Sequence, residues 1–188
     1  TGQWVTTNDR DDVLAALKFL ENSEYGVTKE IGILGISKGA NAALAALKHT
    51  SKIQVVVTDG AFSTTETVLD YVKKWAQIFI PNSWICRNTP DWFYRMMVRV
   101  SLSISSLQLH CGFIGIEKSL RHTSVPILFI HGERDGYVSP RQAQYLFNIT
   151  HSQEDIWIVP KARHNEAVEV MSEEYQEKVV SFFNGNMK

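Results

Sequence analysis

The sequence has few of the residues that mark several common protein classes. It contains two cysteines in 188 residues, Cys86 and Cys111, with no C-x-x-C pair and no histidine cluster at metal-ligand spacing. Neither a disulfide framework nor a zinc site is indicated, and two free thiols are expected. The sequence indicates no metal and no cofactor.

An excess of charge of either sign is also lacking. The formal net charge is −1, and the 19 Lys and Arg residues are scattered along the chain. The densest basic group, Arg87, Arg95 and Arg99, is interleaved with apolar residues, which is typical of a solvated face. We therefore expect no nucleic-acid partner.

Long apolar runs are absent as well. The longest uncharged run, 100–116, carries four Ser, one Gln and one His, so it is a poor candidate for a membrane span. The N-terminus has no initiator Met, no apolar signal core and no basic leader, which indicates an internal start. We expect a chain that is soluble or at most interfacial, with the cytoplasm as the default compartment.

What the sequence does contain is enough hydrophobic residues, 44% of the chain, for the core of one domain. The segment 31–47, IGILGISKGANAALAAL, predicts a strand, a sharp turn and a helix. Ile31, Ile33 and Leu34 indicate a strand buried on both faces, and Ala40–Leu47 a helix that is apolar all round.

The turn between them has the pattern G-x-S-x-G, of which roughly 0.05 chance matches are expected in this chain. Such a turn holds Ser37 in a strained backbone so that its hydroxyl projects into open space. The glycines, Gly35 and Gly39, leave room for strand and helix to approach each other.

The rest of the chain predicts further strands and helices in alternation. Strands are expected at 53–58, 126–130 and 155–159, and amphipathic helices at 11–20, with acids in its first turn, and at 168–182. Alternation of this kind predicts a parallel sheet flanked by helices, the α/β class.

The segment 61–125 is far longer than an ordinary crossover, and we interpret it as a helical cap inserted into a single domain, 1–188. It is rich in aromatic residues, which belong either to the core of the cap or to a substrate pocket. The pocket hypothesis places Trp92 and Phe93 against the substrate.

Polar residues that could activate a serine follow the predicted strands. Ligands of open parallel sheets bind beyond the carboxyl ends of the strands. Ser37 follows the first strand, Asp135 the third and His164 the fourth. Asp59, which ends the second strand, and Glu133 are alternative acids, and five other histidines are alternative bases: His49, His110, His122, His131 and His151.

The motifs GISKG, HGERDGYVSP and PKARHNEAV resemble, in this order, the nucleophile, acid and histidine motifs of the α/β-hydrolase superfamily. The resemblance spans most of the chain, and the small-lid esterases and serine-peptidase-like members are the most similar group. It implies an α/β-hydrolase fold with Ser37 as nucleophile, His164 as general base and then acid, and Asp135 as the orienting carboxylate. Lys38 and Ala40 depart from the pattern, so the acyl and leaving groups stay open.

The resemblance also implies an oxyanion hole with two backbone donors, the N–H of Lys38 and one from a loop after an earlier strand. The chain begins just before the helix that precedes the Ser37 strand. We therefore expect the C-terminal part of a larger hydrolase, with the N-terminal strands missing and the remainder of the fold as a partner. Strand 31–36 would then be an exposed edge, through which the chain is expected to self-associate.

The expected activity is that of a serine hydrolase that cleaves an ester, thioester or peptide-like acyl bond of a small molecule or peptide through an acyl-enzyme. GISKG also resembles the motif of acyl-CoA thioesterases, so a thioesterase or acyltransferase-like enzyme is an alternative. A non-catalytic binding module on the same fold is another.

Overall fold

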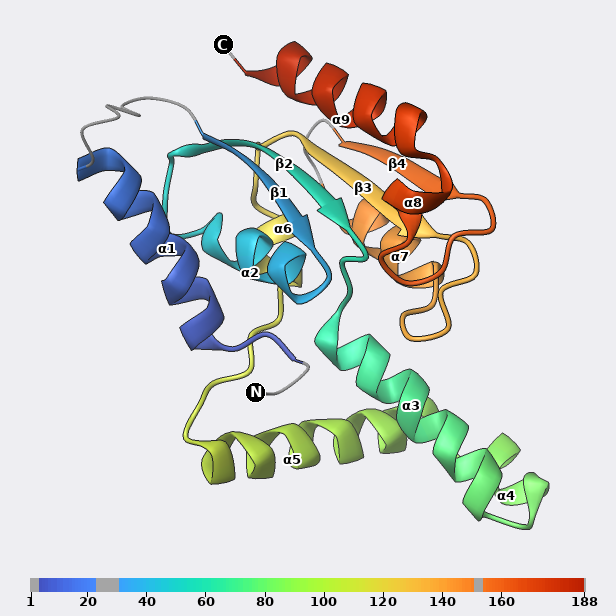
Figure 1. Cartoon of the computed structure of the whole chain (residues 1–188). Helices are drawn as coiled ribbons and strands as arrows, with labels where there is room; N and C mark the ends of the chain where they lie inside the picture. The colour runs from blue at the N-terminus through green and yellow to red at the C-terminus, as the bar shows by residue number, and fades with distance from the viewer. Residues whose placement is uncertain (1–3, 23–30, 151–153, 188) are drawn as a thin grey trace.

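The computed structural model describes residues 4–22, 31–150 and 154–187. Its centre is a parallel sheet in the order β1-β2-β3-β4 (Figure 1), built from Ile31–Ile36, Ile53–Asp59, Ile127–Gly132 and Glu154–Val159. Each strand lies within two residues of its predicted bounds. The sheet confirms the predicted α/β class, and its four carboxyl ends meet at one edge.

Helices cover both faces of the sheet (Figure 1). On one face lie α1 (Thr7–Asn22), α2 (Lys38–Ala46), α6 (Glu117–Leu120) and α7 (Arg141–Ile149), and on the other α8 (Ala167–Val170) and α9 (Ser172–Asn186). Successive strand residues point to opposite faces. Val56 and Phe129 accordingly pack under the first set of helices, and Val57 and Ile130 under the second.

Two helices differ from their predicted bounds. α1 begins four residues earlier, because the Asp9 carboxylate accepts hydrogen bonds from the N–H and the hydroxyl of Thr6, at 2.8 and 2.7 Å, and so caps the helix. The single C-terminal helix predicted over 168–182 is divided into α8 and α9. Met171 between them has a non-helical backbone, with φ −136° and ψ 57°.

The prediction that the first strand is buried on both faces is wrong. Leu34 and Ile36 of β1 are 43% and 48% exposed. β1 pairs with β2 along one side and forms an edge of the described sheet. On the α9 face, the ring of Phe183 covers Gly32 at the start of β1, while Leu34 and Ile36 further along the same face are left open. Self-association through this edge stays a prediction.

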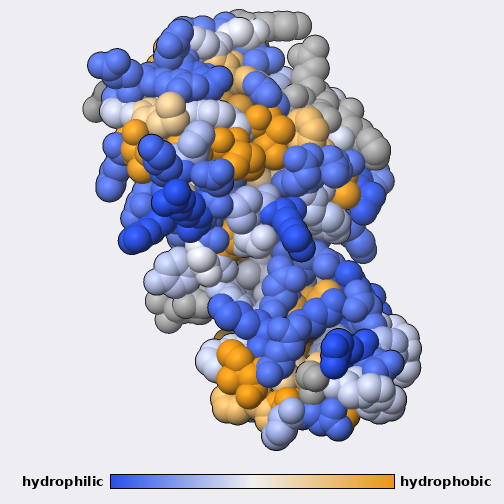
Figure 2. All heavy atoms as spheres, turned by 90° about the vertical axis from the view of Figure 1, so that its right-hand side faces the viewer, coloured by the Kyte–Doolittle hydropathy of each residue, from blue (hydrophilic) through white to orange (hydrophobic). Residues whose placement is uncertain are grey.

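The segment between β2 and β3 forms a lobe that stands away from the sheet (Figures 1 and 2). The lobe consists of α3 (Thr64–Phe79), α4 (Ser83–Asn88) and α5 (Asp91–Leu109), and Leu69, Tyr94 and Val98 form a small core of its own. α6 lies in the same segment, but its residues pack into the core under the sheet. We call α3 to α5 the cap. In the described part of the chain, no helix is long and apolar enough to cross a membrane.

Candidate active site at the carboxyl ends of the strands

The backbone at Ser37 is strained, as the turn pattern predicts. Ser37 has φ 51° and ψ −117° between β1 and α2, a conformation that costs about 1–3 kcal/mol for a residue other than glycine. Its N–H donates a 2.7 Å hydrogen bond to the carbonyl oxygen of Asp59 at the end of β2. The neighbouring strand therefore holds the turn in place.

One of the two glycines of the turn is required by packing. A Cβ on Gly35 would lie 2.6 Å from Cα of Ala40, so β1 and α2 can be this close with glycine alone. A Cβ on Gly39 would meet no atom of the described residues within 4 Å. The expectation that both glycines serve close approach is therefore wrong for Gly39.

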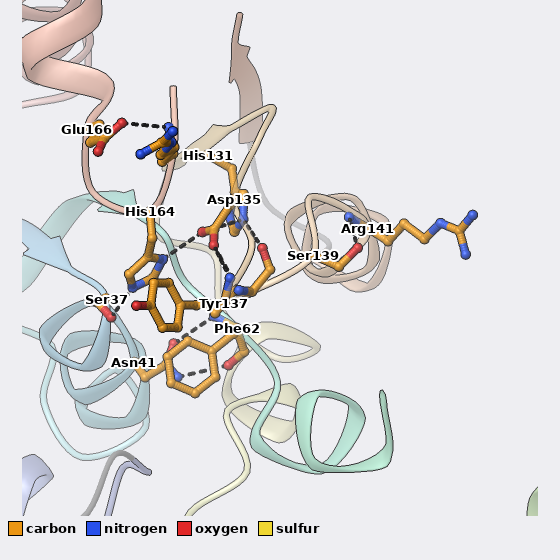
Figure 3. A network of polar contacts seen from close by, with 12 residues as sticks. Ser37, Asn41, Phe62, His131, Asp135, Tyr137, Ser139, Arg141, His164 and Glu166 are labelled. Atoms are coloured by element: carbon orange, nitrogen blue, oxygen red, sulfur yellow. Dashed lines mark hydrogen bonds and ion pairs between the residues drawn. The ribbon is translucent and has the colours of Figure 1, made fainter. Parts of the chain in front are cut away.

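The structure brings Ser37, His164 and Asp135 together at the carboxyl ends of the strands (Figure 3). Ser37 Oγ lies 2.9 Å from His164 Nε2, and His164 Nδ1 lies 2.6 Å from Asp135 Oδ2. The three side chains come from the loops after β1, β3 and β4. They form one continuous chain of hydrogen bonds.

Asp135 is held as a carboxylate. Burial disfavours its charged form, but hydrogen bonds from His131, His164 and the N–H of Val138 outweigh that effect and hold the pKa of Asp135 well below its ordinary value. Its Oδ1 accepts the N–H groups of Tyr137 and Val138, both at 2.8 Å. Because a carboxylate can only accept, His164 Nδ1 carries a proton, and the neutral ring presents Nε2 to Ser37 as an acceptor.

His131 is a second support of Asp135, and the sequence did not predict this role. The ring is fully buried, and its Nε2 lies 3.0 Å from the carbonyl oxygen of Val138 and 3.2 Å from Asp135 Oδ2. Both neighbours are acceptors, so Nε2 carries the proton. The sequence could have indicated this contact, because His131 and Asp135 are four residues apart across the turn after β3.

Asp59, the alternative acid, lies close to the site but has other partners. Its side chain is 2% exposed and Oδ1 has no hydrogen-bond partner among the described residues. Burial raises the pKa of Asp59, opposed by a hydrogen bond from Tyr175 and by the nearby rings of His131 and His164. The structure thus gives Asp135, rather than Asp59, the hydrogen bond to His164 Nδ1.

The loop that carries His164 fits closely against the end of β2. Lys161 and Asn165, on either side of His164, have φ values of 65° and 61°, which turn the loop sharply. Gly60 has φ 72°, and a Cβ there would lie 3.0 Å from Asn165 Oδ1 and 3.2 Å from His164 Cε1. A glycine at position 60 therefore lets the histidine loop approach Ser37.

A cavity of about 290 Å³ opens beside Ser37 and His164, between the sheet and the cap. Its walls include four aromatic residues that the sequence did not single out: Trp4, Phe62, Tyr71 and Tyr137. The hydroxyl of Tyr71, on α3, donates a 2.8 Å hydrogen bond to the carbonyl oxygen of Tyr137, in the loop after β3. The cavity is at the lower end of the range for small-ligand sites, about 300–1,000 Å³.

Asn41 fixes the base of this cavity. It is fully buried in α2, and its amide group contacts both sides of the Phe62 backbone, donating to the carbonyl oxygen at 2.9 Å and accepting from the N–H at 3.0 Å. In the sequence, this role could have been inferred from Asn41 itself, an amide side chain within a predicted helix that is rich in alanine. α2 therefore carries Ser37 at its start and, one turn later, holds the segment that leads into the cap.

The remaining predicted site residues are Lys38, which lies beside Ser37, and Trp92 and Phe93, which lie in the cap. Lys38 is the first residue of α2, where backbone N–H groups have no partner inside the helix, and its Nζ pairs with Asp9 at 2.8 Å. Trp92 and Phe93 do not line the cavity at Ser37. They line a separate hollow between α4 and α5, at the end of the cap away from the sheet. Within the described ranges, no group of His, Cys, Asp and Glu could hold a metal ion.

Comparison with known proteins identifies the fold and the family. The model of the prolyl oligopeptidase family matches residues 3–188. No curated protein matches the chain.

Many solved structures are similar to this chain. An esterase of Pyrococcus furiosus has a TM-score of 0.68 at 21% identity, and the match covers 99% of this chain and 64% of the esterase. A cold-adapted esterase from an Arctic intertidal metagenomic library has a TM-score of 0.61 at 16% identity, and the match covers 97% of this chain and 60% of that esterase. A meta-cleavage product hydrolase of Pseudomonas fluorescens has a TM-score of 0.57 at 17% identity over 94% of this chain and 70% of its own. The chain thus spans about 60–64% of the two esterases. The similarity confirms the α/β-hydrolase fold.

Proposed function

The chain belongs to the prolyl oligopeptidase family, and from this premise we propose that it is a serine hydrolase that cleaves an acyl bond through an acyl-enzyme on Ser37. The observation that carries the proposal is the continuous chain of hydrogen bonds from Ser37 through His164 to Asp135. A serine hydroxyl is a poor nucleophile unless a base takes its proton, and the base needs an orienting acid.

In the first half of the reaction, Ser37 Oγ attacks the carbonyl carbon of the substrate while His164 Nε2 takes the hydroxyl proton. Asp135 stabilises the imidazolium that forms. When the tetrahedral intermediate collapses, the bond to the leaving group breaks and His164 gives its proton to that group. The acyl group remains on Ser37 as an ester.

In the second half, His164 takes a proton from water, whose oxygen attacks the ester. Collapse of the second intermediate releases the acid and returns the proton to Ser37 Oγ. The N–H of Lys38, at the start of α2, is the backbone donor that we assign to the negative oxygen of both intermediates. One such donor is typically worth roughly 2.7–4 kcal/mol of transition-state stabilisation.

The aromatic cavity supports a substrate whose acyl group is small and apolar. Trp4, Phe62, Tyr71 and Tyr137 line the cavity beside Ser37, and the lining as a whole is more apolar than polar. Esters, thioesters and peptide-like bonds of such acyl groups are all compatible with this wall. The leaving group separates an esterase or peptidase from a thioesterase or acyltransferase, and comparing p-nitrophenyl, thioester and anilide substrates of one acyl chain would distinguish them.

The proposal is tested by labelling the chain with a fluorophosphonate and mapping the modified residue by mass spectrometry. We expect the label on Ser37, because the base that activates it is in place. The matched controls are Ser37→Ala, which should take up no label, and Ser63→Ala, a change at a fully buried serine, which should leave the label on Ser37. A folded chain without label on Ser37 would favour a non-catalytic binding module on the same fold.

A further inference from the structure

α5 carries apolar side chains on two faces, about 120° apart round the helix. One face packs against α3 through Tyr94 and Val98, both buried. On the other face lie five exposed apolar residues, which we call the α5 seam: Phe93, Met97, Val100, Ile104 and Leu107. The spacing alternates between four and three residues, which is the pattern that packs against another helix in a coiled coil.

The borders of the seam favour another protein surface over a lipid surface. Helices that lie on membranes are rich in Lys and Arg along their polar face. At 100° per residue, the seam is flanked by Ser101, Ser103 and Gln108, none of which is charged. Arg95, further round the helix, makes two hydrogen bonds with Glu66. The exposed Arg99 lies about 100° round the helix from Val100, away from the seam. Two copies of the seam can therefore approach without bringing like charges together.

A hollow lies at one end of the seam and a prominent side chain at the other. The hollow, of about 460 Å³, lies between α4 and α5 and is lined by Trp84, Trp92 and Phe93 among others. Leu107, near the opposite end of α5, is 76% exposed, the largest exposed fraction among the described large apolar residues. Residues 93 and 107 are separated by 14 positions, or about 21 Å along the helix.

We propose that α5 pairs antiparallel with α5 of a second copy of this chain, around a two-fold axis at Val100. Val100 is the midpoint between Phe93 and Leu107, so the axis places Leu107 of each copy over the hollow of the other. The same surface then serves both partners, as in an isologous dimer. This inference does not depend on the chemistry at Ser37.

The exposed area agrees with a dimer interface. Trp84 and Trp92 are 66% and 65% exposed, and a side chain of this kind buries about 150–250 Å² when it is covered. Together with the five seam residues, the uncovered surface is on the order of 700 Å². Monomeric proteins rarely expose such a patch, and a standard interface buries about 800 Å² per partner. Figure 2 shows hydrophobic side chains gathered at the lower edge of the cap.

The first test is light scattering coupled to size exclusion. We expect twice the 21.3 kDa of one chain for the wild type, and the mass of one chain for Val100→Arg. The matched control is Phe19→Arg, which changes an apolar residue on α1 that is more exposed than Val100, 72% against 52%, and should leave the dimer intact. Circular dichroism and fluorophosphonate labelling of Ser37 check that Val100→Arg is folded.

The second test uses the symmetry. A cysteine at position 100 would face its own copy across the axis, so mild oxidation of Val100→Cys should give a disulfide-linked dimer. The wild type, with Cys86 and Cys111, and Phe19→Cys are the controls and should not cross-link comparably. A wild type of single-chain mass, or a dimer that survives Val100→Arg, would overturn the proposal. So would a monomer that sediments with anionic vesicles through the seam, because that result would assign the surface to lipid.

Discussion

The N–H of Ser37 donates to the carbonyl oxygen of Asp59 at 2.7 Å, so the end of β2 sets the backbone from which the serine hydroxyl projects. The contact uses the main chain of Asp59 and leaves its carboxyl group free for Tyr175. Asp59 and Asp135 therefore support the site in different ways. One acts through its backbone and the other through its side chain.

The first prediction follows from this difference. Asp135→Asn and His164→Ala should each lower kcat by about 10³-fold or more, because a base that is misoriented or missing cannot activate Ser37. Asp59→Asn keeps the backbone hydrogen bond and should cost much less. Steady-state kinetics on a p-nitrophenyl ester would measure all three variants. If Asp59→Asn is the most damaging change, Asp135 is not the orienting acid.

The second prediction concerns stability and pH. The folded chain lowers the pKa of Asp135, so the carboxylate stabilises the fold above its ordinary pKa, and this contribution is lost as pH falls through the folded-state pKa. Burial raises the pKa of Asp59, so its contribution has the opposite sign and is lost as pH rises. As pH falls from about 7 to about 2, the free energy of unfolding should fall less in Asp135→Asn than in the wild type, and more in Asp59→Asn. Urea unfolding at several pH values would measure the free energy of unfolding of the wild type and both variants. The same dependence on pH in all three proteins would contradict the prediction.

The third prediction compares the two glycines of the Ser37 turn. Gly35→Ala forces β1 and α2 apart and should destabilise the chain by about 1–3 kcal/mol, with a loss of activity. Gly39→Ala meets open space within α2, and the gain in helix propensity should leave stability equal or slightly higher. Thermal unfolding and ester hydrolysis of both variants would check this. Equal losses would mean that the turn needs both glycines.

The fourth prediction concerns the choice of acyl group. The sequence directed attention to Trp92 and Phe93, but the cavity at Ser37 is lined by Tyr71 and Tyr137. Tyr71→Ala and Tyr137→Ala should change the ratio of kcat/KM between short and long acyl esters several-fold, because they widen the wall beside the acyl group. Trp92→Ala is the matched control and should leave the ratio unchanged. If Trp92→Ala changes the ratio and the two tyrosine variants do not, the outer end of the cap, rather than the cavity at Ser37, selects the acyl group.

The fifth prediction concerns the exposed edge of β1. Bare edges of apolar strands recruit other chains, and lysine on an edge prevents such pairing. Leu34→Lys should therefore reduce assemblies larger than a dimer, as measured by dynamic light scattering at increasing concentration, while the dimer formed through α5 should persist. Large assemblies that persist unchanged in Leu34→Lys would show that β1 is not their route.

The sequence predicted those features that depend on local pattern. Hydrophobic runs located the four strands, and the convergence of parallel strand ends brought Ser37, Asp135 and His164 into one expected site. The features that it missed depend on packing between distant segments. The contact of Tyr71 with Tyr137 joins the cap to the loop after β3, and no local pattern of residues indicates it.

The local sequence pattern also could not predict which face of a strand is buried. The apolar residues of β1 suggested a strand covered on both sides, but burial depends on where α9 crosses the sheet. His131 could be placed at a strand end, yet its support of Asp135 depends on how the loop after β3 folds back.

The clamp of Asn41 on Phe62 also determines how the cap can move. Asn41 of α2 holds both the N–H and the carbonyl oxygen of Phe62, so the cap can tilt about a point just before α3. α3 has 16 residues and is about 24 Å long, with Thr67 about a fifth of the way along it, Tyr71 about halfway and Phe79 at the far end. A tilt about Phe62 therefore moves Phe79 most, Tyr71 about half as far and Thr67 least. The hydrogen bond from the Tyr71 hydroxyl to Tyr137 opposes this movement of the cavity wall. The outer end of the cap can thus adjust to whatever it touches by a larger distance than the residues beside Ser37.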